Sequence, residues 1–288
     1  MNRGIRLSLA PARGARDGGV ERYGHWLAQA LAERGLLSAT GVPFSLKARD
    51  GGEVVRTGDG VSAAWVEACG LSPKTWRGHV ERERGAVQAA RRVVATSPMV
   101  AAELARFYKR SDAVVVLNPL IAPVAEPVVI ASGALVFVGH GFERKGLARW
   151  LSVLAWLPGV HGHVVGNDQR PRRWRALAER MGLADRVHFH GAVEAAPFIA
   201  GAALLLHPAH YEPYGNVVAE AVAAGTPVVT SDAVGAACLL DPHHVWRSAD
   251  GFDALRATVE RALSHPRPPV GQPPSADAHI EALLAACA

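Results

Sequence analysis

One segment in the second half of the chain predicts a complete strand, loop, helix and strand. Residues 202–206 form a short apolar run that is typical of a buried parallel strand. Residues 216–224 are good helix formers, and Gly225 directly after them predicts where the helix ends. The apolar run 228–230 then predicts a second strand. This order of elements indicates an α/β domain built on a parallel sheet.

Two glutamates lie on either side of the expected helix start, with seven residues between them. Glu212 lies in the loop before the helix, and Glu220 lies about one turn inside it. We expect Asn216 to cap this helix and to leave free backbone N–H groups at its start, where an anion such as a diphosphate binds. The two carboxylates can then contact one ligand from different depths, one near a sugar ring and one near a ribose. The alternative is that both glutamates are solvated and bind no ligand.

A glycine-rich turn with two adjacent cations follows another predicted strand at residues 135–138. Gly139 and Gly141 let the backbone approach a ligand closely, and Arg144 and Lys145 can neutralise a diphosphate. The spacing fits neither a P-loop nor the glycine fingerprint of a dinucleotide-binding domain. The alternative is a basic helix start exposed to water, which the helix dipole disfavours unless an anion is present.

The combination of these segments resembles the retaining GT-B glycosyltransferases of family 4, also known as glycosyl transferases group 1. The resemblance is carried by Glu212 and Glu220 at their separation, by the turn 135–146, by the run 224–229 and by Gly235. It is nearest to the bacterial lipopolysaccharide-core branch. It implies an α/β protein with two Rossmann-like domains that face a cleft, the GT-B fold, in which the N-terminal domain is reduced.

The same resemblance implies an activity. The enzyme would move a hexose from a nucleoside-diphosphate sugar, with a UDP-sugar as the expected donor, to an envelope glycan or glycolipid acceptor. The configuration at the anomeric carbon would be retained, and no cofactor beyond the sugar nucleotide would be needed. We expect no metal ion either, since no Asp-x-Asp pair lies at a predicted strand end. The expected partners are the sugar nucleotide, the acceptor and, at most peripherally, an anionic membrane surface.

Individual residues take roles from the resemblance. The expected catalytic set comprises Glu212, Lys145, Arg144 and Asp59. Asp59 lies in the turn after a predicted strand and would face the reaction crevice, and His79 is a second candidate on the acceptor side. The alternatives are that Asp59 only forms a turn and that His79 is structural.

The expected donor-binding residues lie on glycine turns and strand ends. The predicted strand in 161–168, which ends at Gly166, and the next predicted strand, 186–191, would help to hold the nucleoside at their ends, and Gly18 and Gly19 precede the first predicted helix. The alternative for His190 is a turn histidine without a ligand, and for the two N-terminal glycines it is an ordinary turn. The full set is Glu220, Gly215, Asn216, Val217, Gly139, Gly141, Gly166, His190, Gly191, Val193, Gly18 and Gly19.

Length and composition bound the domain organisation. With 288 residues, of which 49% are hydrophobic, the chain is long enough for two compact α/β domains. We expect an acceptor-side domain at 1–120, a nucleotide-sugar-binding domain at 128–262, and a proline-rich tail with a crossover helix at 263–288. The resemblance is poor at 37–76, and family members are usually longer in the N-terminal half, so the N-terminal domain is expected to be short.

Cysteine spacing and hydropathy predict the compartment. Three widely spaced cysteines fit neither a disulfide framework nor a zinc site, which favours a reducing cytoplasm. No stretch reaches the roughly 18 apolar residues of a membrane span, and the N-terminus lacks a signal-peptide core. We therefore expect a cytoplasmic protein that is at most peripheral on the inner face of the membrane. The net charge of +5 favours anionic partners, but no nucleic-acid-binding motif is found, and nucleic acid is not an expected partner.

Three other functions stay open on the sequence alone. The first is nucleotide-sugar binding without transfer, which a shortened N-terminal domain would favour. The second is a UDP-sugar epimerase of GT-B architecture, although we identify no acid and base for the sugar C2. The third is nucleic-acid binding, which would show a steep salt dependence.

Overall fold

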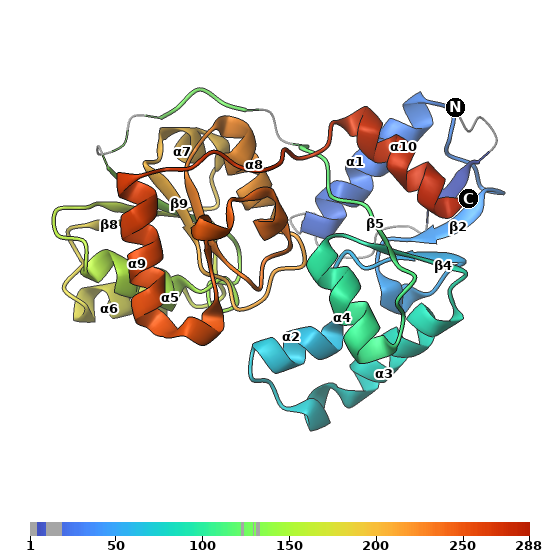
Figure 1. Ribbon diagram of the computed structural model, residues 1–288, viewed down its shortest axis with the longest axis horizontal. Helices are drawn as coiled ribbons and strands as arrows, with labels where there is room; N and C mark the ends of the chain where they lie inside the picture. The colour runs from blue at the N-terminus through green and yellow to red at the C-terminus, as the bar shows by residue number, and fades with distance from the viewer. Residues whose placement is uncertain (1–4, 10–18, 122–123, 129, 131–132) are drawn as a thin grey trace. The chain divides into compact units, whose positions relative to one another are not determined.

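Two compact units make up the chain, each built on one parallel sheet (Figure 1). Unit 1 comprises residues 1–121 and 274–288, and unit 2 comprises residues 122–273. These two Rossmann-like α/β units confirm the expected fold class. The computed structural model describes residues 5–9, 19–121, 124–128, 130 and 133–288.

Within the described residues, unit 1 has a five-stranded parallel sheet in the order β1-β2-β3-β4-β5. The last strand of this sheet is short, since Val114 and Val115 are the residues that pair with β4, at the edge of the sheet. The strands are β1 (Leu7–Leu9), β2 (Val42–Ser45), β3 (Val54–Arg56), β4 (Arg92–Ala95) and β5 (Val114–Val115).

Helices of unit 1 pack on this sheet and on one another. Leu27 of α1 and Leu283 of α10 are fully buried in one core with Val54 and Val94 of the sheet. Helix α3 begins with Pro73 in its first turn. Proline is well suited to the first turn of a helix, where its missing N–H would have no partner. The helices are α1 (Gly19–Glu33), α2 (Ser62–Ala68), α3 (Pro73–Ala89), α4 (Pro98–Tyr108) and α10 (Ala276–Cys287).

The C-terminal helix α10 is held on unit 1 by a buried histidine as well as by its apolar side chains. His279 Nδ1 donates to the carbonyl of Leu117 at 2.7 Å, so its Nε2 is free to accept from the hydroxyl of Tyr23 at 2.8 Å. This arrangement requires a neutral imidazole. Burial, reinforced by the nearby charge of Arg56, accordingly lowers the pKa of His279 to about 4.

Unit 2 contains, in the described part of the chain, a six-stranded parallel sheet in the order β11-β10-β9-β6-β7-β8. The strands β7 and β8 follow β6 toward one edge of the sheet, whereas β10 and β11 follow β9 toward the other edge. The carboxyl ends of β6 and β9 therefore form a topological switch point, which is where open α/β sheets bind ligands. The strands are β6 (Leu135–Val138), β7 (Gly162–Val165), β8 (Val187–Gly191), β9 (Leu204–His207), β10 (Val228–Ser231) and β11 (Val245–Trp246).

The core of unit 2 lies between the sheet and three of its helices. Trp150 of α5, Trp174 of α6 and Leu255 of α9 are buried against Leu135 and Leu204 of the central strands. The predicted strand, loop, helix and strand are confirmed as β9, α8 and β10. Among the helices described in the chain, none is both long enough and apolar enough to cross a bilayer. The helices of unit 2 are α5 (Leu147–Ala155), α6 (Pro171–Arg180), α7 (Ala196–Gly201), α8 (Asn216–Ala224) and α9 (Gly251–Ser264).

The buried His279 should make the stability of the protein depend on pH. The unfolded chain binds a proton at this residue below pH 6.5, whereas the folded chain does so only near pH 4. The free energy of unfolding should therefore fall as the pH is lowered through this window, by about 1.4 kcal/mol per pH unit for each such histidine. Urea unfolding between pH 4.5 and 7 should show a shallower pH dependence for His279→Gln than for the wild type. The exposed His25, changed to Gln, is the control in the same unit, and equal slopes in all three proteins would contradict this assignment.

Candidate functional site

Polar residues at the carboxyl ends of β6 and β9 form the candidate site, at the switch point of unit 2. The turn 139–146 follows β6 and leads into α5, and the loop 208–215 follows β9 and leads into α8. A backbone hydrogen bond joins the two segments, since His210 N donates to the carbonyl of Arg144 at 2.9 Å. The fold thus brings together the two segments that the sequence singled out.

One carboxylate oxygen of Glu212 accepts hydrogen bonds from two cations. Arg144 Nη1 donates to Glu212 Oε2 at 2.9 Å and to the carbonyl of Tyr211 at 2.8 Å. Lys145 Nζ donates to the same Oε2. The side chains of Lys145 and Glu212 are only 12% and 14% exposed, whereas that of Arg144 is 35% exposed. A nearly buried carboxylate therefore holds two cations at the carboxyl ends of β6 and β9.

Burial and ion pairing act against each other in this cluster. Burial alone would raise the pKa of Glu212, but Lys145 and Arg144 outweigh it and bring that pKa to about 2. Burial lowers the pKa of Lys145, and Glu212 limits the decrease. Glu212 is thus ionised at neutral pH, because the two cations compensate for its lost hydration.

Glycine turns at the ends of β6 and β7 lie in direct backbone contact. Gly141 N donates to the carbonyl of Asn167 at 3.1 Å, and Gly166 N donates to that of Gly191 at 2.8 Å. Gly166 has φ of +124°, and a Cβ atom there would lie 1.9 Å from the carbonyl oxygen of Gly139. Only glycine fits this position, so four of the expected donor-binding glycines do lie close together in the fold.

The start of α8 differs by one residue from the sequence-based expectation. The N-cap position is occupied by Gly215, and Asn216 is the first residue of the helix. The reason is the backbone of Gly215, which has φ of +91°, a left-handed conformation that asparagine adopts less readily than glycine. Val217 follows in the first turn and is buried. The helix start still directs its first backbone N–H groups toward the carboxyl edge of the sheet.

Glu220 lies one turn into α8 and is half-buried. Its charge acts to raise the pKa of Lys145, less strongly than that of Glu212 does. The structure thus brings both glutamates of the sequence signature near the same lysine.

His207, which the sequence did not single out, is the last residue of β9 and is fully buried. Within the described residues neither of its ring nitrogens has a hydrogen-bond partner. Burial, together with the nearby charges of Lys145 and Arg144, lowers its pKa to about 3. The only signal in the sequence was its position, a polar residue directly after an apolar strand. A neutral imidazole with two unpaired nitrogens therefore lies beside the ion cluster.

His190 belongs to a row of stacked histidines on β7 and β8. Its Nε2 lies 2.9 Å from Nδ1 of His163, their rings are stacked, and the ring of Phe198 lies 4.5 Å away between centroids. Burial, with the charges of neighbouring histidines, lowers the pKa of His163 to about 4. In the part of the chain that the structure describes, no group of three or more His, Cys, Asp or Glu side chains could hold a metal ion. A nucleotide contact of His190 stays a prediction, as does that of the exposed Val193.

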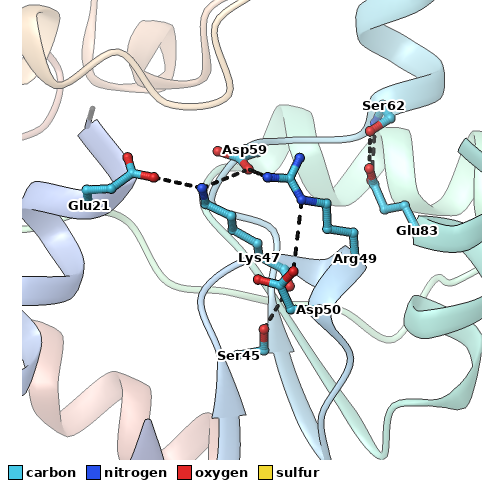
Figure 2. A network of polar contacts seen from close by, with 8 residues as sticks. All are labelled: Glu21, Ser45, Lys47, Arg49, Asp50, Asp59, Ser62 and Glu83. Carbon is cyan, nitrogen blue, oxygen red and sulfur yellow. Dashed lines mark hydrogen bonds and ion pairs between the residues drawn. The ribbon is translucent and has the colours of Figure 1, made fainter. Parts of the chain in front are cut away.

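The remaining expected residues lie in unit 1. Asp59 follows β3 and lies 3.9 Å from Lys47 Nζ and 4.0 Å from Arg49 Nη2 (Figure 2). Gly19 is the first residue of α1, and Gly18 lies outside the described residues. The catalytic role of Asp59 stays a prediction.

Comparison with known proteins agrees with these observations. Residues 132–265 match the family of glycosyl transferases group 1. The lipopolysaccharide glucosyltransferase WaaG of Escherichia coli is 44% identical over 107 residues, which are 35% of this chain and 28% of WaaG. The crystal structure of WaaG superposes with a TM-score of 0.75 over 90% of both chains at 22% identity. That of Anabaena HepE in complex with UDP-glucose has a TM-score of 0.63 at 17% identity over 90% of this chain and 89% of HepE.

The similarity in sequence is confined to part of the relatives. The chain spans between 28% and 54% of the length of three lipopolysaccharide glycosyltransferases that it matches. The two structural similarities lie below 25% identity and concern the fold, which is that of the GT-B proteins.

Removal of Lys145 should change the titration of Glu212. In a Lys145→Met protein the pKa of Glu212 should rise from about 2 by about one to three units, because a contacting positive charge is lost while the burial stays. Carboxyl carbon NMR as a function of pH measures this value directly. An Arg173→Gln protein, in which an exposed arginine paired with Glu143 is lost, should leave it unchanged. An unchanged Glu212 in the Lys145→Met protein would show that Lys145 does not hold the carboxylate in its ionised form.

Proposed function

We propose that this chain, whose residues 132–265 match the group 1 glycosyltransferases, transfers a hexose from a nucleoside-diphosphate sugar to an acceptor hydroxyl with retention of configuration. The observation that carries the proposal is the contact of Arg144 and Lys145 with one oxygen of Glu212 at the switch point of unit 2. It gathers positive charge where open α/β sheets bind nucleotides.

In this proposal Arg144 and Lys145 bind the diphosphate of the donor. The negative charge on the diphosphate grows as its bond to the sugar breaks, and cations already in place stabilise this charge without having to reorganise. The start of α8, with Gly215, Asn216 and Val217, adds backbone N–H groups and the positive end of its dipole. The two side chains and the helix start thereby supply positive charge without a metal ion.

The two glutamates would contact the sugar and the nucleoside. Glu212 is ionised at neutral pH, so it can accept hydrogen bonds from sugar hydroxyls and stabilise positive charge at the anomeric carbon. Glu220 would accept from the ribose hydroxyls. The close backbones of Gly139, Gly141 and Gly166 would leave room for the nucleotide beside the strand ends.

Retention follows if the acceptor hydroxyl attacks on the face from which the diphosphate leaves. The bond between the anomeric carbon and the phosphate oxygen breaks, and the bond to the acceptor oxygen forms on the same side. The proton of the acceptor hydroxyl passes to an oxygen of the departing diphosphate. Asp59 of unit 1 would orient the acceptor, and no other base is required.

Two relatives support the choice of donor and acceptor. HepE was solved with UDP-glucose, which favours a UDP-sugar as donor. WaaG is a lipopolysaccharide glucosyltransferase, which favours an envelope glycan or glycolipid as acceptor. The net charge of +5 would assist peripheral contact with an anionic membrane that carries such an acceptor, on its cytoplasmic face.

Donor binding can be tested by thermal unfolding with UDP, GDP and ADP. We expect UDP to raise the melting temperature, since a ligand at about one hundred times its dissociation constant stabilises the folded state by about 2.7 kcal/mol. The effect should be lost in Lys145→Ala and reduced in Glu220→Ala, and it should persist in the control Arg173→Ala. If none of the three nucleotides stabilises the wild type, the proposed donor site is wrong.

Turnover is tested with labelled UDP-glucose and a lipopolysaccharide-core acceptor. Lys145→Ala should lower kcat by about 10²-fold to 10³-fold, as the loss of one preorganised donor does in other enzymes. Arg173→Ala should retain wild-type activity. UDP binding without any transfer would favour the binding-only function, and interconversion of UDP-sugars without an acceptor would favour an epimerase. Full activity in Lys145→Ala would remove its catalytic role.

A further inference from the structure

A second charged cluster lies in unit 1, at the carboxyl ends of β2 and β3. Lys47, Arg49 and Asp50 follow β2, the last two of them in the single turn of 3₁₀-helix Ala48–Asp50, and Asp59 follows β3. Glu21 reaches the cluster from the first turn of α1. Figure 2 shows Lys47 between Glu21 and Asp59, and Arg49 between Asp50 and Asp59.

The inner part of the cluster is a tight ion pair. Lys47 Nζ donates to Glu21 Oε1 at 2.7 Å, and the two side chains are only 14% and 12% exposed. Asp59 lies farther from Lys47, at 3.9 Å. The charge of Lys47 is thus already paired with that of Glu21, so we do not expect Lys47 to bind an anionic ligand.

The outer part, around Arg49, is loose and open. Its guanidinium lies 4.0 Å from both Asp50 and Asp59, beyond hydrogen-bond distance, and its side chain is 37% exposed. No hydrogen bond of this guanidinium is found within the described part of the chain. An arginine fork donates two parallel hydrogen bonds to a phosphate or carboxylate. Arg49 therefore has its donors available to an anionic ligand.

The turn that carries Asp59 is tightly constrained. Gly60 N donates to the carbonyl of Thr57 at 3.1 Å, and a Cβ atom on Gly58 would lie 2.7 Å from the carbonyl oxygen of Leu46. The loops after β2 and β3 are thus packed backbone to backbone. This contact holds the carboxylate of Asp59, which is 46% exposed, beside Arg49.

Helix α3 packs against the 3₁₀ turn that carries Arg49, and its His79 is close enough to sense the charges of the cluster. Burial and the charges of Arg49 and Arg82 lower the pKa of His79, whereas Asp59 opposes this, so His79 lies in the field of the cluster. Its ring meets that of Trp76 edge to face at 5.8 Å between centroids. Carboxylates that accept from hydroxyl groups, next to aromatic rings that cover an apolar ring face, are the combination that suits a sugar.

Glu83, also drawn in Figure 2, does not belong to the open part. It is buried and accepts from both the backbone N–H and the hydroxyl of Ser62, at the start of α2. Its hydrogen bonds are therefore used within unit 1, whereas Arg49, Asp59 and His79 remain as contacts for a ligand.

We propose that Arg49, Asp59 and His79 form a binding subsite for a sugar that carries a phosphate or carboxylate group. Arg49 donates to the anionic group, Asp59 accepts from a hydroxyl, and the rings of His79 and Trp76 border the sugar. Identifying this sugar as the acceptor rests on the proposed transferase function. The binding itself does not.

Isothermal titration of the full chain with three probes tests the subsite. Glucose 6-phosphate and glucuronate carry the two anionic groups, and glucose carries none. Saturating UDP, or the Lys145→Ala background, keeps the probes from reporting on the donor site. We expect at least one anionic sugar to bind about tenfold more tightly than glucose, and Arg49→Ala to abolish this preference, because it removes a charged hydrogen-bond donor.

Two further variants make the result specific to the guanidinium. Arg49→Lys keeps the charge and should restore part of the affinity, whereas Arg106→Ala removes an exposed arginine paired with Glu67 elsewhere in unit 1 and should bind as the wild type does. Binding of only one anionic sugar assigns its group as the ligand. Equal binding of all three probes, or full binding by Arg49→Ala, overturns the proposal.

The Asp59→Asn variant distinguishes binding of the sugar hydroxyls from binding of the anionic group. The loss of a negative charge should strengthen the binding of inorganic phosphate and weaken that of the anionic sugar, so the ratio of the two affinities falls. An unchanged ratio would show that Asp59 does not contact the sugar.

The outcomes also distinguish this subsite from the proposed function. Arg49-dependent binding of an anionic sugar by a chain that binds no nucleotide would uphold the subsite and contradict the transferase. If the chain binds UDP and transfers sugar, but its Arg49→Ala variant binds anionic sugars as well as the wild type does, the transferase function is upheld and the subsite is contradicted.

Discussion

The contact of Glu212 with both Arg144 and Lys145 is the interaction on which the unit 2 site depends. A lysine or a carboxylate that is nearly buried on its own tends to lose its charge, because burial removes its hydration. Together the three side chains keep their charges, and the pKa of Glu212 falls to about 2. The contact is possible only because the switch point places the turn after β6 next to the loop after β9.

This arrangement has a consequence for ligand binding under the proposed function. Glu212 favours the charged form of Lys145 and holds both cations close together before a diphosphate arrives, so the positive charge need not be assembled during the reaction. His207 lies beside the cluster as a neutral ring, because burial and the charges of Lys145 and Arg144 lower its pKa. Burial thus makes the site sensitive to the loss of any one charge, which is why single substitutions should have large effects.

Unit 1 also has a cluster of cations and carboxylates, but they are paired differently. There the tight pair of Lys47 and Glu21 lies inside, and Arg49 lies at the surface, 4.0 Å from both Asp50 and Asp59. In unit 2 both cations contact one carboxylate, whereas in unit 1 the cation and the carboxylate at the surface are 4.0 Å apart. Under the two proposals, the cluster of unit 2 holds two cations together for a diphosphate. The cluster of unit 1 places a hydrogen-bond donor, Arg49, beside an acceptor, Asp59, for a sugar that carries both an anionic group and hydroxyl groups.

The sequence by itself determined the local structure and the segments of the site. Apolar runs and glycines predicted β9, α8 and β10, because strands and helices follow from short-range patterns. Only the tertiary structure decided which atoms meet: that Arg144 and Lys145 share one oxygen of Glu212, and that a buried, unpaired His207 lies beside them. It also decided that a left-handed Gly215 precedes α8 and that Arg49, which no pattern marks, lies beside Asp59. These contacts join residues far apart in the chain, and their geometry depends on strand order and loop packing, which no local pattern encodes.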